Sequence, residues 1–95
     1  MNIKDIRKKK SEILAISKEC GATNIRLFGS VVRDEITKDS DIDFLVNFEP
    51  NRSLFDQSRL KWKLEEIFKR KVDVVSETEL NEYIKDSILK ESLEI

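Results

Sequence analysis

Two aspartates separated by a single residue are the part of this sequence best suited to chemistry. Asp41 and Asp43 lie in the segment DIDFLVNF, whose alternating apolar residues are typical of a β-strand. Side chains two residues apart on a strand point to the same face, so the two carboxylates are expected side by side. Such a pair is repulsive unless a cation lies between its members, and oxygen ligands favour a hard cation such as Mg²⁺. The pair therefore predicts a metal site.

A third aspartate, Asp73, lies in the apolar segment KVDVV, where an isolated charge would be costly without a partner. If this segment is a neighbouring strand, Asp73 completes a cradle for two metal ions on the order of 3.5–4 Å apart. An ion pair of Asp73 with Lys71 or Arg26 is the simpler alternative.

Gly29 and Ser30, which lie upstream of the aspartates, are suited to bind phosphate. Gly29 and Ser30 follow the short apolar segment NIRLF, and ten residues separate Ser30 from Asp41. Backbone N–H groups at a tight turn, together with a serine hydroxyl, form an anion site. Arg33 is expected either to reach this site or the carboxylates, or to form an ordinary surface ion pair.

Simpler explanations of the aspartate pair are an acidic strand start that faces water, and a calcium loop. Asp39, Asp41 and Asp43 have the spacing of an EF-hand. That loop is excluded, because Phe44 stands where the loop needs glycine and Pro50 where it needs glutamate. Aspartate is also depleted in strands, which argues against a merely solvated strand start.

Periodicity predicts the elements that must position these side chains. A first helix is expected from Ile3 to Cys20, stopped by Gly21. Strands are expected at 24–28, 41–48 and 71–75, a short helix at 31–36, and a longer helix from Ser53 to about 68. The capping box of Ser76 and Glu79 is expected to open a last helix. This order, α-β-α-β-α-β-α, predicts one domain over residues 1–95 of the α/β or α+β class, with a small mixed sheet flanked by helices.

Composition excludes several classes of function. The 95 residues suit one small domain, and 18 basic against 19 acidic residues give a net charge of -1, so direct nucleic-acid binding is not expected. The absence of histidine excludes Ser-His-Asp and Cys-His catalysis, and Cys20, the single cysteine, excludes an internal disulfide. Neither a signal peptide nor a membrane-spanning run is present, which favours the cytoplasm and no membrane partner.

Two segments of the chain resemble a known family. The segment LFGSVVRDEITKDSDIDFLV resembles the signature of the DNA polymerase β-like nucleotidyltransferase superfamily, and KVDVV is similar to its third-aspartate strand. The small size is similar to the minimal nucleotidyltransferase branch, which is found as the antitoxin half of toxin–antitoxin pairs with HEPN-type ribonucleases. The resemblance covers nearly the whole chain, roughly Ile13 to Leu89.

The resemblance implies a polymerase β-like fold and a role for each site residue. Gly29 and Ser30 would form the triphosphate-binding turn, and Arg33 matches the usual basic residue of the family. The metal ligands would be Asp41, Asp43 and Asp73, holding two Mg²⁺ ions, with Mn²⁺ as an alternative and ATP as the substrate. The third aspartate would also help to orient or deprotonate the attacking hydroxyl.

The resemblance further implies that the chain moves AMP from ATP onto a tyrosine of a HEPN-type toxin and so silences it, in a hetero-oligomer with that toxin. The alternative is a non-catalytic antitoxin that neutralises its partner by stoichiometric binding. Transfer to a small molecule is a weaker alternative, because the chain is too short to hold a separate substrate domain. Trp62 and Tyr83 are expected to serve packing or partner contacts.

Overall fold

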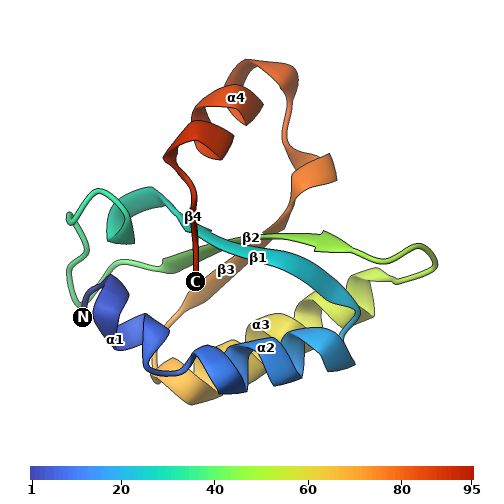
Figure 1. The fold of residues 1–95 in the computed structure, drawn as a ribbon, viewed down its shortest axis with the longest axis horizontal. Coiled ribbons are helices and arrows are strands. Elements are labelled where there is room, and N and C mark those ends of the chain that lie inside the picture. Colours follow the sequence, from blue (N-terminus) through green and yellow to red (C-terminus); the bar gives the residue numbers. More distant parts are fainter.

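A mixed sheet of four strands forms the centre of the molecule in the computed structural model, which describes residues 1–95 (Figure 1). Its strands are β1 (Ala22–Phe28), β2 (Ile42–Phe48), β3 (Val72–Ser76) and β4 (Leu93–Glu94). Their spatial order is β3-β2-β1-β4. β1 is antiparallel to both β2 and β4, whereas β2 and β3 are parallel. The predicted mixed sheet is therefore confirmed.

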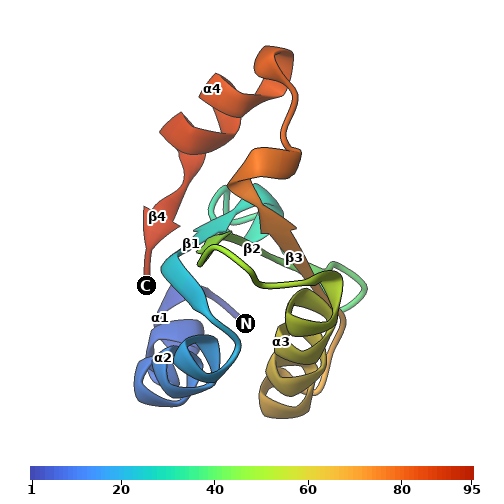
Figure 2. The ribbon, with the colours of Figure 1, turned by 90° about the vertical axis from the view of Figure 1, so that its right-hand side faces the viewer.

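Helices lie on both faces of the sheet. Figure 2 shows α1 (Ile3–Arg7), α2 (Lys10–Glu19) and α3 (Leu54–Phe68) on one side, and α4 (Glu82–Glu91) on the other. α3 joins the two parallel strands, as a crossover connection requires. None of the helices combines the length and the apolar character that crossing a membrane demands.

The main core fills the space between the sheet and the helices α1, α2 and α3. Ile42, Phe44 and Val46 are fully buried and alternate along β2, which confirms the predicted apolar face of this strand. The rings of Phe44 and Phe68 pack with their centroids 6.2 Å apart, which ties α3 to the sheet. Cys20 is buried and unpaired in this core, as expected of a small apolar side chain.

The caps of α3 agree with the sequence. Ser53 Oγ accepts a hydrogen bond from the Phe55 N–H at 3.2 Å, and Asp56 Oδ2 accepts one from the Ser53 N–H at 3.0 Å. Together these bonds form a capping box at the first turn. The helix ends at Lys69, which adopts the left-handed conformation with φ of 55°.

Two helices predicted near the N-terminus differ in extent from the structure. The first is interrupted at residues 8–9, where the run of three lysines has no buried side chain to support a helical turn. The second, predicted at 31–36, is only a short 3₁₀ turn at Gly29–Val31. It cannot continue, because Asp34 adopts a left-handed backbone with φ of 58°.

The C-terminal part also departs from the prediction. The capping box of Ser76 and Glu79 is present, but it closes a 3₁₀ turn at Glu77–Glu79 instead of opening a long helix. Glu79 Oε1 also accepts a bond from Gln57 Nε2 of α3 at 2.7 Å, which anchors this turn beside the sheet. Asn81 caps α4 instead, and β4, a strand of two residues, was not predicted at all.

Candidate functional site

The Gly29 turn and Asp43 are in direct contact. Phe28, the last residue of β1, pairs with Asp43 of β2, so the turn that follows β1 lies beside the Asp43 carboxylate. Gly29 has φ of 76°, and a Cβ atom at this position would collide with Asp43 Oδ2. Glycine is therefore required here twice, for its backbone conformation and for the close approach of the carboxylate.

The backbone after Gly29 folds tightly and fixes the position of the next residues. The Gly29 carbonyl accepts hydrogen bonds from the N–H groups of Val32 and Arg33, at 3.1 and 3.2 Å. The Ser30 carbonyl accepts one from the Glu35 N–H at 2.9 Å. The first N–H groups of such a turn have no acceptor within it, which leaves them available to an anion.

The three predicted aspartates lie on one side of two adjacent strands. Asp43 and Asp73 are partners in the parallel register of β2 and β3, so their side chains share a face of the sheet. Asp41 immediately precedes β2, two residues before Asp43, and the alternation of an extended chain places it on that face. Asp43 is partly buried, whereas Asp41 and Asp73 are exposed.

The electrostatics of Asp43 reflect this crowding. Burial, and then the charges of Asp73 and Asp41, raise the pKa of Asp43 from its ordinary 3.8 to about 6, while Arg33 opposes the rise. None of the three aspartates takes part in an ion pair, and Arg26, the suggested partner of Asp73, pairs with Glu77 instead. The simpler explanation of Asp73 as half of a salt bridge is therefore wrong.

The donor set fits a divalent cation in chemistry, although its side chains do not converge. No group of three or more aspartate, glutamate, histidine or cysteine side chains lies close enough to share one metal ion. The available groups are nevertheless oxygen donors without a basic partner, and their charges are mutually repulsive, which is the condition that a hard cation relieves.

Arg33 forms the surface ion pairs that were the alternative to a site role. Its Nε donates to Glu35 Oε1 at 2.9 Å, and its Nη1 donates to Glu91 Oε1 at the end of α4. The hydrogen bonds to Glu91 and then to Glu35 raise the pKa of Arg33. The positive charge of Arg33 nevertheless lowers the pKa of Asp43, against the effects of burial and of the neighbouring carboxylates.

Two further arginines form hydrogen bonds whose partners were not predicted from the sequence, and one of them, Arg70, supports the candidate site. Arg70 Nη2 donates to the carbonyl oxygens of Thr37 and Ser40, the latter at 2.8 Å, and so anchors the loop that delivers Asp41. Arg26 is buried on β1, where it bonds Asn47 Oδ1 at 3.1 Å and Glu77 at 3.0 Å. The position of Arg70, next to the strand of Asp73, was the only available signal, because neither arginine lies in a motif.

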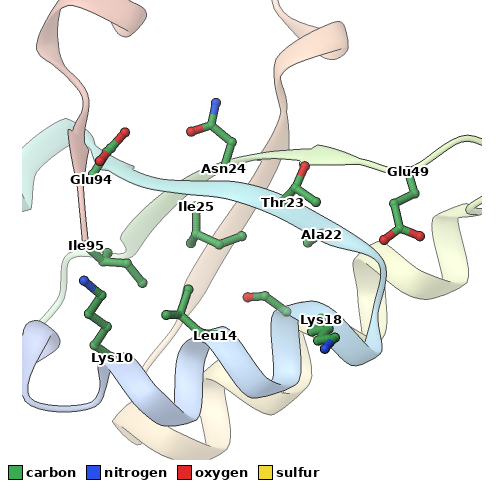
Figure 3. A pocket seen from close by; sticks show the side chains of 11 residues that line it. Lys10, Leu14, Lys18, Ala22, Thr23, Asn24, Ile25, Glu49, Glu94 and Ile95 are labelled. Atoms are coloured by element: carbon green, nitrogen blue, oxygen red, sulfur yellow. The ribbon is translucent and has the colours of Figure 1, made fainter.

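A cavity of about 330 Å³ opens elsewhere, between α2 and the first half of β1 (Figure 3). Leu14 and Lys18 line it from the helix, and Asn24 and Ile25 line it from the strand. The cavity contains none of the aspartates or the glycine turn. The candidate site therefore lies outside this cavity, and two of its three aspartates, Asp41 and Asp73, are exposed to solvent.

Two residues that were predicted to make packing or partner contacts are exposed to solvent. Trp62 on α3 is 67% exposed and Tyr83 on α4 is 95% exposed. Neither side chain packs in the core, which leaves partner contact as the remaining part of that prediction. Phe55, at the start of α3, is similarly exposed.

Comparison with known proteins assigns the chain to a family. The family described as "Nucleotidyltransferase domain" matches residues 3–95. A candidate protein adenylyltransferase of Methanocaldococcus jannaschii is 39% identical over 95 residues, covering 100% of this chain and 99% of its own length. The protein adenylyltransferase MntA of Thermococcus cleftensis is 39% identical over 71 residues, covering 75% of this chain and 72% of its own.

Solved structures give the same result for the fold. A candidate minimal nucleotidyltransferase superposes with a TM-score of 0.89 at 38% identity, over 100% of this chain and 97% of that one. A crystal structure of a toxin–antitoxin with AMP-PNP gives a TM-score of 0.74 at 20% identity, over 88% and 69% of the two chains. The predicted resemblance is confirmed, and the chain belongs to the nucleotidyltransferase domain family.

Proposed function

We propose that this chain is a metal-dependent protein adenylyltransferase, which moves AMP from ATP onto a hydroxyl group, most simply a tyrosine, of a HEPN-type toxin and so acts as its antitoxin. The observation that carries the proposal is the contact between Gly29 and Asp43, with Asp73 in register on the next strand. In this arrangement the turn that we propose to bind phosphate lies against a group of unpaired carboxylates. Nucleotidyl transfer needs these two features together.

Each residue has a role that its place in the fold supports. The Gly29 and Ser30 turn would hold the phosphates, with Arg33 adding positive charge from the same turn. The carboxylates of Asp41, Asp43 and Asp73 would hold divalent cations, two Mg²⁺ or Mn²⁺. Such ions, when bound, neutralise charge on the triphosphate and lower the pKa of a hydroxyl group.

The reaction would proceed at the α-phosphorus of ATP. A bond forms between the acceptor oxygen and that phosphorus, the bond to the β-phosphate oxygen breaks, and pyrophosphate leaves. Because the chain has no histidine, the hydroxyl proton goes to a carboxylate. Asp73 is best placed, since it is exposed and lies on β3, the outermost strand on its side of the sheet.

A protein acceptor fits the openness of this face. Asp41 and Asp73 are exposed, so a bulky side chain on a partner can approach them without entering an enclosed cavity. Relatives named as protein adenylyltransferases, and a structural relative described as a toxin–antitoxin with AMP-PNP, support a toxin as partner and ATP as donor.

The test compares ATP labelled on the α-phosphate with ATP labelled on the γ-phosphate. The purified chain, Mg²⁺ and host lysate are incubated with each label, using wild type, Asp43→Asn and the control Asp39→Asn, which alters an exposed loop aspartate. A protein band labelled only from the α-phosphate, present in wild type and control, is expected to vanish in Asp43→Asn and when EDTA is added. Transfer at the wild-type rate by folded Asp43→Asn would exclude this mechanism.

The second candidate is an antitoxin that only binds. The exposed apolar side chains Phe55 and Trp62, which lie seven residues apart on α3, favour a docking surface independent of catalysis. The double variant Asp41→Ala, Asp43→Ala separates the two candidates. Neutralisation of the toxin at the wild-type dose would establish that binding suffices, whereas loss of neutralisation with retained complex formation would establish that transfer is needed.

A further inference from the structure

α4 is joined to the rest of the molecule by very few interactions. None of its residues is buried, and Figures 1 and 2 show it standing away from the sheet on the face opposite α2 and α3. The core includes no residue of this helix, neither among its buried members nor among the partly buried side chains that pack against it. The ion pair between Arg33 and Glu91 is the only salt bridge from α4 to another part of the chain.

This single ion pair lies at the candidate site. The backbone of Arg33 is bonded to Gly29, so its side chain starts from the proposed phosphate-binding turn. Glu91, the last residue of α4, has a side chain that is only 22% exposed. Both charges act on Asp43, Arg33 lowering its pKa and Glu91 raising it. The ion pair therefore links the Gly29 turn to α4.

The Arg33 guanidinium cannot serve Glu91 and a triphosphate fully at the same time. Its Nη1 donates to Glu91 and its Nε to Glu35, so each of the two forks that could bind phosphate oxygens already has one nitrogen engaged. A triphosphate carries more negative charge than a carboxylate, so it competes well for this cation. Once displaced from Arg33, the negative charge of Glu91 would be repelled by the triphosphate and by Asp43.

We propose that Glu91 acts through Arg33 as a built-in competitor of the nucleotide, so that nucleotide binding at the Gly29 turn releases α4 from the body of the molecule. This inference rests on the proposed function, because it takes Arg33 as a phosphate ligand. Glu91 is then a positioning residue that sets nucleotide affinity. The helix that carries it becomes the element that responds to the nucleotide.

The exposed apolar side chains of α4 make this response relevant to a partner. Tyr83 and Ile84 are 95% and 45% exposed at the start of the helix, and Leu93 directly after it is 39% exposed. Release of Glu91 leaves α4 attached only through its flanking segments, of which the C-terminal one is the short strand β4. A docked protein that contacts this helix would therefore sense whether the nucleotide site is filled.

The test measures nucleotide affinity and the mobility of α4 in the same proteins. Wild type, Glu91→Gln and the matched control Glu35→Gln are titrated with AMP-PNP and Mg²⁺ by calorimetry, and amide hydrogen exchange over residues 82–91 is followed with and without AMP-PNP. Removing the Glu91 charge is expected to tighten AMP-PNP binding about threefold to fivefold, the upper part of the range of an exposed ion pair. A residue that merely supports the fold would weaken binding when changed, so the direction is diagnostic.

Hydrogen exchange gives the second readout. In wild type, exchange over α4 is expected to accelerate when AMP-PNP is added. In Glu91→Gln it should be fast already and unchanged by the nucleotide. The Glu35→Gln variant removes the other partner of Arg33 but leaves the tie to α4, so its helix should respond as in wild type.

The two proposals fail in different ways. If wild type and Glu91→Gln bind AMP-PNP equally and exchange over α4 is unaffected in both, the competition is refuted while the nucleotidyltransferase proposal stands. If neither protein binds AMP-PNP, the proposed function is refuted and the role of Glu91 with it.

Discussion

Replacing Asp43 by asparagine is expected to stabilise the metal-free protein at neutral pH while abolishing transfer. Asp43 lies against the Gly29 turn and between two other unpaired carboxylates. Asparagine keeps the shape of the side chain but removes its charge. The change therefore relieves the repulsion and the cost of partial burial without opening a cavity.

The magnitude follows from the pKa of Asp43, which rises from its ordinary 3.8 to about 6. One pKa unit corresponds to about 1.4 kcal/mol, so an unscreened carboxylate would cost the fold about 3 kcal/mol when ionised. Asp43 is partly exposed, and solvent screening reduces this figure to about 1 kcal/mol.

The sign of the pH dependence is determined by the raised pKa. Because the folded protein holds this proton more tightly than the unfolded chain, the favourable contribution of protonated Asp43 is complete below pH 3.8 and is lost as the pH rises through about 6. Above pH 6 the ionised group is a net cost, which asparagine removes. The difference between variant and wild type should therefore be largest near pH 7 and shrink towards pH 4.

Urea unfolding followed by circular dichroism, in EDTA at pH 4, 5, 6 and 7, measures this difference. In thermal unfolding of a domain of 95 residues, the same difference of about 1 kcal/mol would appear as a rise in Tm of about 4–8 °C. Asp39→Asn, in the exposed loop before the site, is the control and should leave stability almost unchanged. A stability of Asp43→Asn that is below wild type at pH 7, or a difference that does not vary with pH, would refute the reasoning.

Two other substitutions test the supports of the site. Gly29→Ala should abolish transfer and lower the free energy of unfolding by about 1–2 kcal/mol, because it strains a left-handed backbone and displaces Asp43. Transfer assays and urea midpoints measure these two effects. A variant with wild-type activity would contradict the close contact between Gly29 and Asp43. Arg26→Met should lower the free energy of unfolding by about 1–2 kcal/mol, since it leaves Glu77, only 24% exposed, without its partner. The double variant Arg26→Met, Glu77→Gln should recover part of this loss in the same urea assay, and no recovery would show that Arg26 acts by packing alone.

Local patterns predict the centre of the fold well, because apolar alternation and helix caps depend on residues close in sequence. The face of β2 that bears Phe44 and the cap at Ser53 are both confirmed. The proximity of Asp43 and Asp73 also follows from sequence, since two strands joined by a helix are expected to be parallel neighbours. For this reason, the sequence alone predicts that Asp43 and Asp73 lie side by side.

Pairings between distant charges could not be predicted in the same way. Arg33 and Glu91 are 58 positions apart, and Arg26 and Glu77 are 51 apart, in a chain where 39% of residues are charged. No periodicity indicates which of these charges meet. The capping box at Ser76 was real, but its local signal could not reveal that Glu79 would also be bonded by a residue of α3.

Two chain connections of different length bring the parts of the candidate site together. The contact of Gly29 with Asp43 belongs to the antiparallel pair β1 and β2, whereas Asp73 arrives only through the crossover that contains α3. Bringing the ends of a longer connection together costs more conformational entropy. Local unfolding starts in the segments with the fewest stabilising contacts. A break within α3 would thus split the candidate site and leave a hairpin that carries the Gly29 turn, Asp41 and Asp43 but not Asp73. Transfer activity would then require the whole sheet to be folded, whereas nucleotide binding would require only the hairpin.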